Sequence, residues 1–331
     1  MQTILITGGA GYIGSHYVLQ LLQMRIFNVI VFDNLSTGHI ETINTLKKHG
    51  DFVFIQGDLK NKNEIEEVFK KYKIDIVVHF AAYSQIEESS KKPEKYFENN
   101  VNGTINLLDS MVKNDVKKIV FSSSAAIYGE PKYLPIDESH PTNPISIYGK
   151  TKLLIENKLD EYDKLYNLKS IRLRYFNVVG ANSDYNIGEI HNPETHLIPN
   201  ILKAIINGTT FNLYGDDYNT KDGTSVRDYI DINDLITAHL FAMKQIHHHN
   251  ETDFFNIGTN KAMSIKEVIE ICQKVTNKKV NIEIKPKREG DPVILVANNR
   301  KAKNILDWSS RIDTEESIKN AYKFLLIHID G

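Results

Sequence analysis

The residues best suited to chemistry are Tyr148 and Lys152, which lie in the segment Tyr-Gly-Lys-Thr-Lys. Residues four positions apart share one face of a helix. A free phenol, with a pKa near ~10, is a poor base at neutral pH. A nearby ammonium stabilises the phenolate and lowers that pKa. The pair therefore predicts a tyrosine that acts as general acid and base.

A serine is placed to work with this tyrosine. Ser124 follows a β-rich apolar run at 118–122, so we expect it at the carboxyl end of a strand. That edge is where α/β sheets bind ligands, and the hydroxyl could bond a substrate oxygen and the phenolate together. A Tyr-x-x-x-Lys pair alone is common on protein surfaces. The elements around the pair decide whether it is a site.

A glycine-rich turn near the start of the chain predicts a dinucleotide site. The apolar run Thr3–Thr7 leads into Gly8-Gly9-Ala10-Gly11-Tyr12-Ile13-Gly14, and a helical pattern follows. Gly8 allows the tight turn, Gly11 lets the backbone approach a pyrophosphate, and Gly14 lets helix and strand pack closely. The helix N-terminus then offers N–H groups to the phosphates. The alternative is a strand–turn–helix that merely needs glycine.

The ends of the next apolar runs favour NAD. Asp33 ends the second run where an acid would bind the adenosine ribose, and its charge repels a 2′-phosphate. No Arg or Lys follows over residues 34–38, so NAD is preferred over NADP. Asp58 ends the third run, where it meets the adenine or simply forms a turn. Residues 80–82 (Phe-Ala-Ala) end the fourth run and would let the dinucleotide lie against the sheet edge.

The elements that must position these residues follow from the hydrophobic pattern. Up to about residue 175, short and nearly continuous apolar runs alternate with amphipathic stretches, as in parallel sheets buried on both faces. Such alternation builds a doubly wound sheet. Beyond residue 175, loops rich in Asn, Asp and Gly separate shorter elements. We therefore expect an α/β fold with a Rossmann-type parallel sheet in an NAD-binding domain (1–175) and a smaller α/β substrate domain (176–331), with interleaved elements. The expected strands are 3–7, 28–32, 52–56, 74–80, 118–122 and 170–175.

Composition and charge exclude several classes of protein. With 41% hydrophobic and 25% charged residues, the chain is globular rather than disordered. A formal net charge of −2 gives no reason to expect nucleic acid or an anionic membrane as partner, and no apolar run approaches the length of a membrane span. The single cysteine, Cys272, excludes an intrachain disulfide and is expected to be buried. There is no room for a signal peptide before the first strand, so we expect a cytoplasmic protein.

No metal centre is expected from the sequence. The consecutive residues His247, His248 and His249 fan around a helix and cannot converge on one ion.

Over nearly its whole length the sequence resembles the extended short-chain dehydrogenases/reductases, and within them the members that epimerise UDP-hexoses at C4. The resemblance is carried, in chain order, by TGGAGYIGSH, DNLSTG, GDL, HFAA, NNVNGT, FSSSAAIYG, YGKTK, LRYFNVVGA, GTSVRDYI and the segment REGD. It implies NAD as a retained cofactor, a UDP-hexose substrate and a homodimer. A helical face over 99–111 is the expected dimer contact, although its apolar spacing fits core packing equally.

The resemblance also implies binding residues by position. Joined with those inferred above, the residues expected to contact NAD are Gly8, Gly11, Tyr12, Ile13, Gly14, Asp33, Asn34, Asp58, Leu59, Phe80, Ala81, Ala82, Asn99, Ser124, Tyr148, Lys152 and Phe176. Those expected to contact the UDP-sugar are Ser124, Tyr148, Asn177, His196, Leu197, Tyr214, Arg227, Arg288, Asp291 and Leu295. A guanidinium offers paired donors to a diphosphate, but Arg227 and Arg288 could instead pair with a neighbouring acid. Tyr214 could stack on uracil or pack in the core.

The implied reaction interconverts UDP-galactose and UDP-glucose. Tyr148 takes the proton of the sugar 4-hydroxyl while hydride passes from C4 to NAD, and the 4-keto sugar turns over and receives the hydride on its other face. Dehydration is disfavoured, because the related dehydratases carry an Asp-Glu pair where this chain has Ala125 and Ala126.

Three departures from the epimerase pattern bear on the substrate. His196 replaces an Asn of some members, and Ser84 replaces a Lys. Leu295 lies near a position that a bulkier Tyr can occupy, so it leaves room for an N-acetyl group or only fills space. UDP-GalNAc and UDP-GlcNAc are therefore candidate further substrates.

Two other functions stay open from the sequence. One is epimerisation of another nucleotide sugar, such as a uronate or a pentose. The other is a non-catalytic, NAD-responsive binding protein on the same fold. Such a protein would not need Ser124, Tyr148 and Lys152 together, and all three are present.

Overall fold

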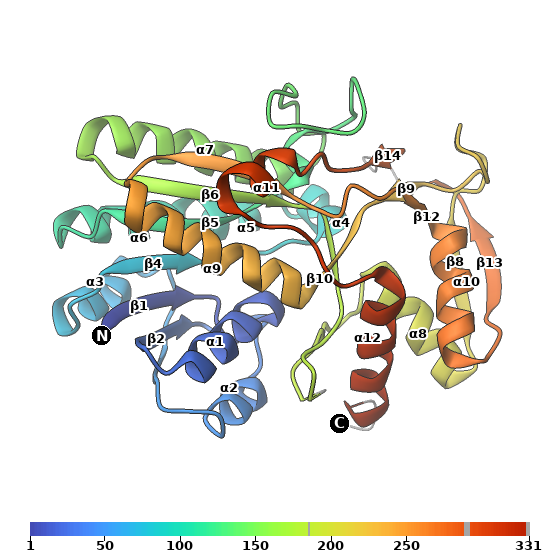
Figure 1. Cartoon of the computed structure of the whole chain (residues 1–331), viewed down its shortest axis with the longest axis horizontal. Helices are drawn as coiled ribbons and strands as arrows, with labels where there is room; N and C mark the ends of the chain where they lie inside the picture. Colours follow the sequence, from blue (N-terminus) through green and yellow to red (C-terminus); the bar gives the residue numbers. More distant parts are fainter. Residues whose placement is uncertain (185, 288–291, 329–331) are drawn as a thin grey trace. The chain divides into compact units, whose positions relative to one another are not determined.

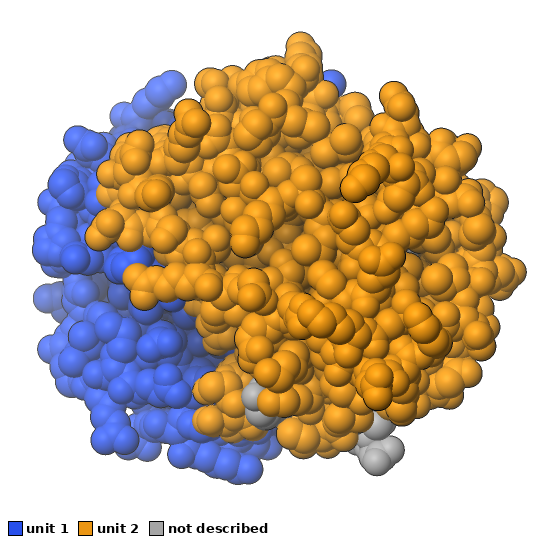
Figure 2. Space-filling model, turned by 45° about the vertical axis from the view of Figure 1, so that its right-hand side comes forward, with its two compact units in different colours: residues 1–129, 142–174, 236–255 blue, residues 130–141, 175–235, 256–331 orange. Residues whose placement is uncertain are grey.

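The structure is a computed structural model that describes residues 1–184, 186–287 and 292–328. The chain forms two compact units, each built from three stretches (Figure 2). The first unit holds residues 1–129, 142–174 and 236–255, and the second holds 130–141, 175–235 and 256–331. The chain thus changes unit near residue 175. Segment 130–141 belongs to the second unit although the residues on either side of it belong to the first. Segment 236–255 belongs to the first unit although its flanking residues belong to the second.

The first unit is built on a seven-stranded sheet (Figure 1). Its order is β11-β6-β5-β4-β1-β2-β3, and the pairs β3–β2, β2–β1, β1–β4 and β4–β5 are parallel. This order is that of a doubly wound nucleotide-binding sheet, so the predicted Rossmann-type fold is confirmed. The strands are β1 (Gln2–Thr7), β2 (Phe27–Asp33), β3 (Val53–Gln56), β4 (Ile76–His79), β5 (Lys118–Ser124), β6 (Lys169–Tyr175) and β11 (Asp253–Ile257).

Helices bury the faces of this sheet. Consecutive residues Ile4, Leu5 and Ile6 are fully buried, and since strand side chains alternate between faces, both faces are covered. One layer consists of the apolar sides of α3, α6 and α7, which form a single cluster with strand residues such as Leu5 and Phe121. The helices are α1 (Tyr12–Met24), α2 (Ile40–Leu46), α3 (Lys62–Lys71), α4 (Ile86–Lys91), α5 (Pro93–Tyr96), a π-helical turn (Phe97–Asn102), α6 (Gly103–Lys113), a 3₁₀ turn (Ala125–Ile127), α7 (Ile147–Tyr166) and α9 (Ile232–His249).

The strand order reverses between β1 and β4, and this reversal sets the position of the site. In open α/β sheets ligands bind at such a switch point, outside the carboxyl ends of the strands. β1 leads into Gly8, β4 leads into Phe80, and the neighbouring β5 ends at Ser124. Strand pairing therefore brings three segments that are distant in sequence to one edge of the sheet.

The second unit contains smaller sheets, with orders β10-β7, β12-β9-β14 and β13-β8. Helices α8, α10 and α12 supply most of its core, which includes Leu202, Cys272 and Phe324. The burial of Cys272 confirms the sequence prediction. The elements are β7 (Asn177–Val179), α8 (Leu197–Asn207), β8 (Thr210–Tyr214), β9 (Val226–Arg227), β10 (Tyr229–Asp231), β12 (Met263–Ser264), α10 (Ile265–Thr276), β13 (Asn281–Lys285), β14 (Ile294–Leu295), α11 (Arg300–Leu306) and α12 (Thr314–His328).

Within the described ranges, none of these helices has both the length and the apolar character needed to span a bilayer.

Candidate active site

The glycine-rich turn between β1 and α1 is tightly packed at one glycine and open at another. A Cβ on Gly14 would lie 2.1 Å from the carbonyl oxygen of Gly8, so a side chain there would force the helix away from the turn. A Cβ on Gly11 would meet only that same oxygen, at 3.4 Å, which is ordinary contact. The protein itself therefore requires glycine at 14 but not at 11. This is the pattern expected if Gly11 is reserved for the close approach of a ligand.

The first turn of α1 is not capped by a side chain. Gly11 is the N-cap residue and has no side chain to bond the first N–H groups of the helix, which begins at Tyr12 and continues through Ile13. Such N–H groups form a ready-made anion site.

Asp33, at the end of β2, is 8% exposed and braces this turn. Its Oδ2 accepts a hydrogen bond from the N–H of Ala10 (3.0 Å), and its Oδ1 accepts one from Leu35 (2.8 Å). Burial raises the pKa of the Asp33 carboxyl, while these two bonds and His39 act in the opposite direction. The predicted ribose-binding acid therefore also has a structural role that the sequence did not indicate.

Asp58, at the end of the β3 segment, forms the turn that was its alternative interpretation. Its Oδ1 accepts the N–H of Lys60 (2.9 Å), and its Oδ2 accepts the side-chain amide of Asn34 (3.1 Å). The following residue, Leu59, is buried in the core between the sheet and its helices. The structure thus joins the ends of β2 and β3, as the predicted adenosine site requires.

The loop after β4 is held by an asparagine that the sequence analysis missed. Asn100 is fully buried, and its side chain accepts the N–H of Tyr83 and donates to the carbonyl of Tyr83, both at 2.9 Å. It also donates to Thr151 Oγ1 on α7 (3.3 Å). Asn100 thereby ties the segment that follows Phe80, Ala81 and Ala82 to the helix that carries Tyr148. The sequence signal was a run of polar residues, Asn-Asn-Val-Asn, inside an otherwise amphipathic stretch.

Asn99 and Asn100 lie in a π-helical turn, Phe97–Asn102, that precedes α6. The single helix expected over 99–111 is therefore two elements. Single π-turns in helices are often found at functional sites. Two of the apolar residues in the helical face that was expected to form the dimer contact, Leu108 and Met111, are fully buried in the core of the first unit. Core packing thus accounts for this part of the stripe.

The Ser124 hydroxyl lies close enough to the Tyr148 phenol to act to lower its pKa. Ser124 ends β5 and caps the 3₁₀ turn that follows, accepting the N–H of Ala126 (3.1 Å). Tyr148 is the second residue of α7, which is capped by Ser146, and its own N–H donates to Ser89 Oγ (3.1 Å). The structure therefore brings together the hydroxyl pair that the sequence predicted.

Gly149 explains the closeness of these two hydroxyls. A Cβ on Gly149 would lie 2.4 Å from the carbonyl oxygen of Ala126, so only glycine allows the start of α7 to rest on the turn after Ser124. The pattern Tyr-Gly-Lys does not by itself indicate this role for Gly149, which stands between Tyr148 and Lys150.

Lys152 lies one turn further along α7 and is 2% exposed. Its Nζ donates to the carbonyl oxygen of Ser122 (2.7 Å) and lies 4.8 Å from the centre of the Phe121 ring and 5.8 Å from that of Tyr148. Burial lowers the pKa of Lys152 to about 7, although Glu156 works to raise it. The ammonium is thus near the phenol but anchored on β5.

The acidity predicted for Tyr148 does not come from the protein residues alone. Burial raises the pKa of Tyr148 to about 12, and the Ser124 hydroxyl only partly opposes this. The sequence argument invoked Lys152 together with a positive nicotinamide ring. Because desolvation penalises the phenolate strongly at this buried position, the second charge is essential to that argument.

A buried ion pair lies one turn beyond Lys152 and was not predicted. Glu156, 2% exposed, accepts two hydrogen bonds from Arg174, at 3.0 and 2.6 Å, and one from Ser123 Oγ at 2.6 Å. Arg174 also donates to Tyr128 Oη (3.0 Å). These bonds clamp α7 to β5 and β6. The sequence shows both charges but not that they meet inside the unit.

In the second unit, Arg227 and Leu295 are neighbours in register on β9 and β14. The guanidinium Nη1 of Arg227 donates to the carbonyl oxygens of Val226 (2.9 Å) and Val293 (3.2 Å). Asp228, the alternative ion-pair partner, instead accepts hydrogen bonds from Thr259, Asn260 and Ala297. Leu295 is 8% exposed, which fits its space-filling interpretation.

The other predicted sugar-nucleotide residues of this unit lie on separate elements. Asn177 opens β7 beside Tyr229 of β10, and Tyr214 ends β8, while Phe176, which was predicted to contact NAD, is buried. His196 and Leu197 start α8, where Leu197 packs on the core and His196 is exposed enough to meet a ligand. Arg288 and Asp291 lie outside the described residues.

A nucleotide-binding sheet with a Ser–Tyr–Lys group at the end of β5 defines the class as short-chain dehydrogenase/reductase-like enzymes. A family model described as GDP-mannose 4,6 dehydratase matches residues 5–321. A UDP-glucose 4-epimerase of Lactobacillus helveticus is 47% identical over 99% of this chain and 98% of its own.

Solved structures agree with this match. A UDP-glucose 4-epimerase from Bifidobacterium longum, in complex with NAD⁺ and UDP, superposes with a TM-score of 0.94 at 34% identity and covers 100% of both chains. One from Stenotrophomonas maltophila, with NAD and a formylated UDP-arabinopyranose, has a TM-score of 0.95 at 33% identity, with 100% and 99% coverage. The chain belongs to the family whose model, described as GDP-mannose 4,6 dehydratase, matches residues 5–321, and within that family to the UDP-glucose 4-epimerases.

Proposed function

We propose that this chain interconverts UDP-glucose and UDP-galactose by reversible oxidation at C4 of the sugar, with NAD as its cofactor. The observation that carries the proposal is the neighbouring hydroxyls of Ser124 and Tyr148, with the buried Lys152 beside them, at the carboxyl edge of a Rossmann-type sheet. The full-length relatives at 45–47% identity, named UDP-glucose 4-epimerases, support the same activity.

The residues of the first unit fit NAD. The uncapped start of α1 suits a pyrophosphate, the open space at Gly11 allows its approach, and Asp33 stands at the end of the neighbouring strand. When bound, NAD supplies a hydride acceptor and donor together with a positive ring.

Within this proposal the side chains handle the proton. Tyr148 Oη accepts the proton of the 4-hydroxyl as C4 is oxidised, and returns it when C4 is reduced. Ser124, whose hydroxyl lies beside Tyr148, aligns the phenol with the sugar oxygen. Lys152 adds positive charge 5.8 Å from the ring and thereby favours the phenolate. In the second unit, Arg227 is the described residue best suited to a diphosphate.

The test is turnover of UDP-galactose by purified protein without added NAD. We expect activity, and a Tyr148→Phe variant should lose ~10²–10⁴-fold in kcat, the range of general acid–base catalysis, while binding UDP as before. Tyr166→Phe, which removes a partly exposed hydroxyl near the other end of α7, is the matched control. Carried NAD without turnover would favour a binding protein, and near-normal turnover in Tyr148→Phe would overturn the assignment.

Substrate breadth is a separate part of the proposal. UDP-GalNAc, UDP-GlcNAc and nucleotide-linked uronates or pentoses should be compared with UDP-galactose in the same assay. The burial of Leu295 favours the plain hexose, so we expect the highest kcat/KM for UDP-glucose and UDP-galactose. Equal turnover of an N-acetylated sugar would contradict that order.

We also propose that the enzyme is a cytoplasmic homodimer, as its resemblance to the epimerases implies. Light scattering of the purified protein tests the dimer, and a monomer at working concentration would refute it.

A further inference from the structure

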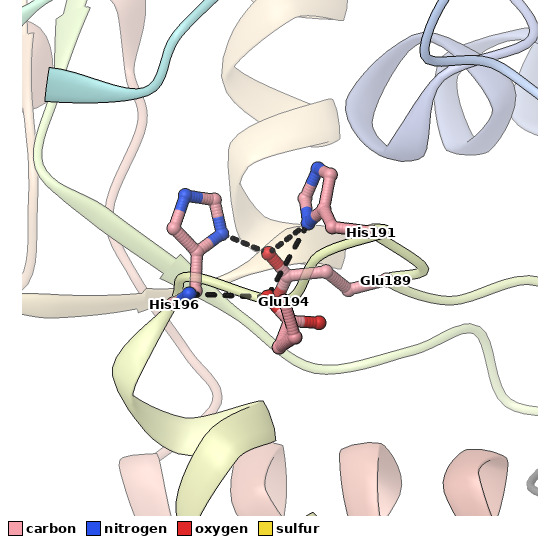
Figure 3. A group of neighbouring side chains, drawn as sticks. All are labelled: Glu189, His191, Glu194 and His196. Carbon is pink, nitrogen blue, oxygen red and sulfur yellow. Dashed lines mark hydrogen bonds and ion pairs between the residues drawn. The ribbon is translucent and has the colours of Figure 1, made fainter. Parts of the chain in front are cut away.

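Two histidines and two glutamates of the second unit converge at the start of α8, in the segment Glu-x-His-x-x-Glu-x-His (Figure 3). One potential ligand atom from each of Glu189, His191, Glu194 and His196 lies within 4.8 Å of all the others. Figure 3 shows both rings and both carboxyl groups facing one point. We propose that this cluster binds one Zn²⁺ ion with four protein ligands.

Two distances from Nδ1 of His191 match the spacing of ligands around a tetrahedral ion, whereas Nδ1 of His196 and Glu189 Oε1 would have to move apart to bind one. Nδ1 of His191 lies 3.3 Å from Glu189 Oε1 and 3.6 Å from Glu194 Oε1. Zn–N and Zn–O bonds of ~2.0–2.2 Å place tetrahedral ligands ~3.3–3.5 Å apart. Hydrogen bonds between N–H and carboxylate oxygens are shorter, at ~2.7–3.2 Å.

A buried nitrogen points into the cluster. Nδ1 of His191 is buried and makes no hydrogen bond of normal geometry with the described residues. Its contacts with Glu189 and Glu194 are ion pairs that are too long or too poorly aligned to be hydrogen bonds, and such a buried nitrogen is uncommon in folded proteins. Nδ1 of His196 also faces the cluster, where it contacts Glu189 Oε1. Both imidazoles therefore present the same nitrogen to the same carboxylate.

Charge and chemistry point to the same class of ion. Two carboxylates and two neutral imidazoles sum to −2, which a divalent cation neutralises. Imidazole nitrogens favour zinc and its neighbours over Mg²⁺ or Ca²⁺, which prefer oxygen ligands. Four protein ligands make a closed site of the structural kind.

Surrounding groups hold the ligands in place. Glu194 Oε1 accepts the N–H groups of Thr195 (2.9 Å) and His196 (3.0 Å), and Lys203 Nζ lies 3.4 Å from Glu194 Oε2. The side chains of Glu189 and Glu194 are each 6% exposed, whereas that of His196 is 46% exposed and leaves a path for entry. The ion would fasten the segment after Gly188 to the start of α8.

Without metal, protons would fill the same role. Burial works to lower the pKa of His191, but the carboxylates of Glu189 and Glu194 outweigh it and raise the pKa to about 10. The pKa of His196 is also raised, since Glu189 outweighs burial and the neighbouring His191. Lys203 adds a positive charge beside Glu194. Metal competes with protons for these imidazole nitrogens, so its affinity should rise with pH.

The test uses the full-length enzyme, treated with a chelator, dialysed and then titrated with Zn²⁺ and with Co²⁺ as a spectroscopic probe. We expect one ion per chain, the intense visible absorption of tetrahedral Co²⁺, and proton release measured by calorimetry in two buffers. His191→Ala and Glu189→Gln should each weaken binding by at least ~100-fold, since loss of a ligand exceeds the effect of an outer partner. His248→Ala, which removes an exposed histidine elsewhere, should bind as the wild type does.

Thermal unfolding keeps the test independent of activity and of variant folding. Zn²⁺ should raise the Tm of the wild type and of His248→Ala, and leave that of His191→Ala and Glu189→Gln unchanged. Substoichiometric metal, a Co²⁺ spectrum without tetrahedral absorption, or unaltered affinity in both variants would overturn the proposal. Should both variants fail to fold, the stoichiometry and the Co²⁺ spectrum of the wild type decide it.

Discussion

Gly149→Ala tests whether the contact between α7 and the turn after Ser124 positions the reactive hydroxyls. The added Cβ would lie 2.4 Å from the carbonyl oxygen of Ala126, whereas real Cβ contacts stay above 3.0 Å, so the two backbones must separate by at least 0.6 Å. That movement displaces Tyr148, the preceding residue, from Ser124. Misplacement of a catalytic group by ~1 Å costs about 10²-fold in rate, so we expect kcat to fall ~10- to 100-fold.

Stability should change much less than activity in this variant. Overpacking costs ~1–3 kcal/mol, while replacing glycine inside a helix returns about 0.8–1 kcal/mol. The assay is UDP-galactose turnover, with UDP affinity and Tm measured on the same samples. Gly50→Ala is the control, because its Cβ would meet only Leu22 at 3.4 Å. A Gly149→Ala enzyme with kcat within twofold of the wild type would refute the positioning argument.

Two further predictions concern buried charges on α7. In the folded protein Lys152 has a pKa near 7, well below the ~10.4 of a free lysine. Between pH 7 and about 10.4 the unfolded chain therefore binds a proton at this residue that the folded chain does not. The free energy of unfolding of the wild type accordingly rises with pH over this range and falls as the pH drops toward 7. The stability of Lys152→Met relative to the wild type should therefore be most favourable at pH 7 and decline toward pH 10 in chemical denaturation; a pH-independent difference would contradict the lowered pKa. Glu156→Gln leaves the Arg174 guanidinium without its carboxylate partner, and breaking such a pair costs about 3–5 kcal/mol. We expect a large drop in Tm, which Glu161→Gln, at the exposed pair with Lys158, should not show.

The sequence by itself determined the strands β1 to β6 of the doubly wound sheet and indicated the candidate reactive residues, because that information is local. The strands from β1 to β6 are short apolar runs, and three of them lead to a residue whose type suits a ligand: Gly8 after β1, Asp33 at the end of β2 and Ser124 at the end of β5. Helical spacing alone placed Tyr148 and Lys152 on one face. The doubly wound sheet followed from the alternation of elements.

Tertiary structure decided what depends on residues far apart in the chain. Asn100 reaches Tyr83 and Thr151, and Glu156 meets Arg174, only after the helices have packed on the sheet. Burial raised the pKa of Tyr148, which spacing could not indicate because desolvation depends on every neighbouring atom. The cluster around Glu189 was missed for a similar reason: its four residues follow no regular period, and only the path of the loop before α8 makes them converge.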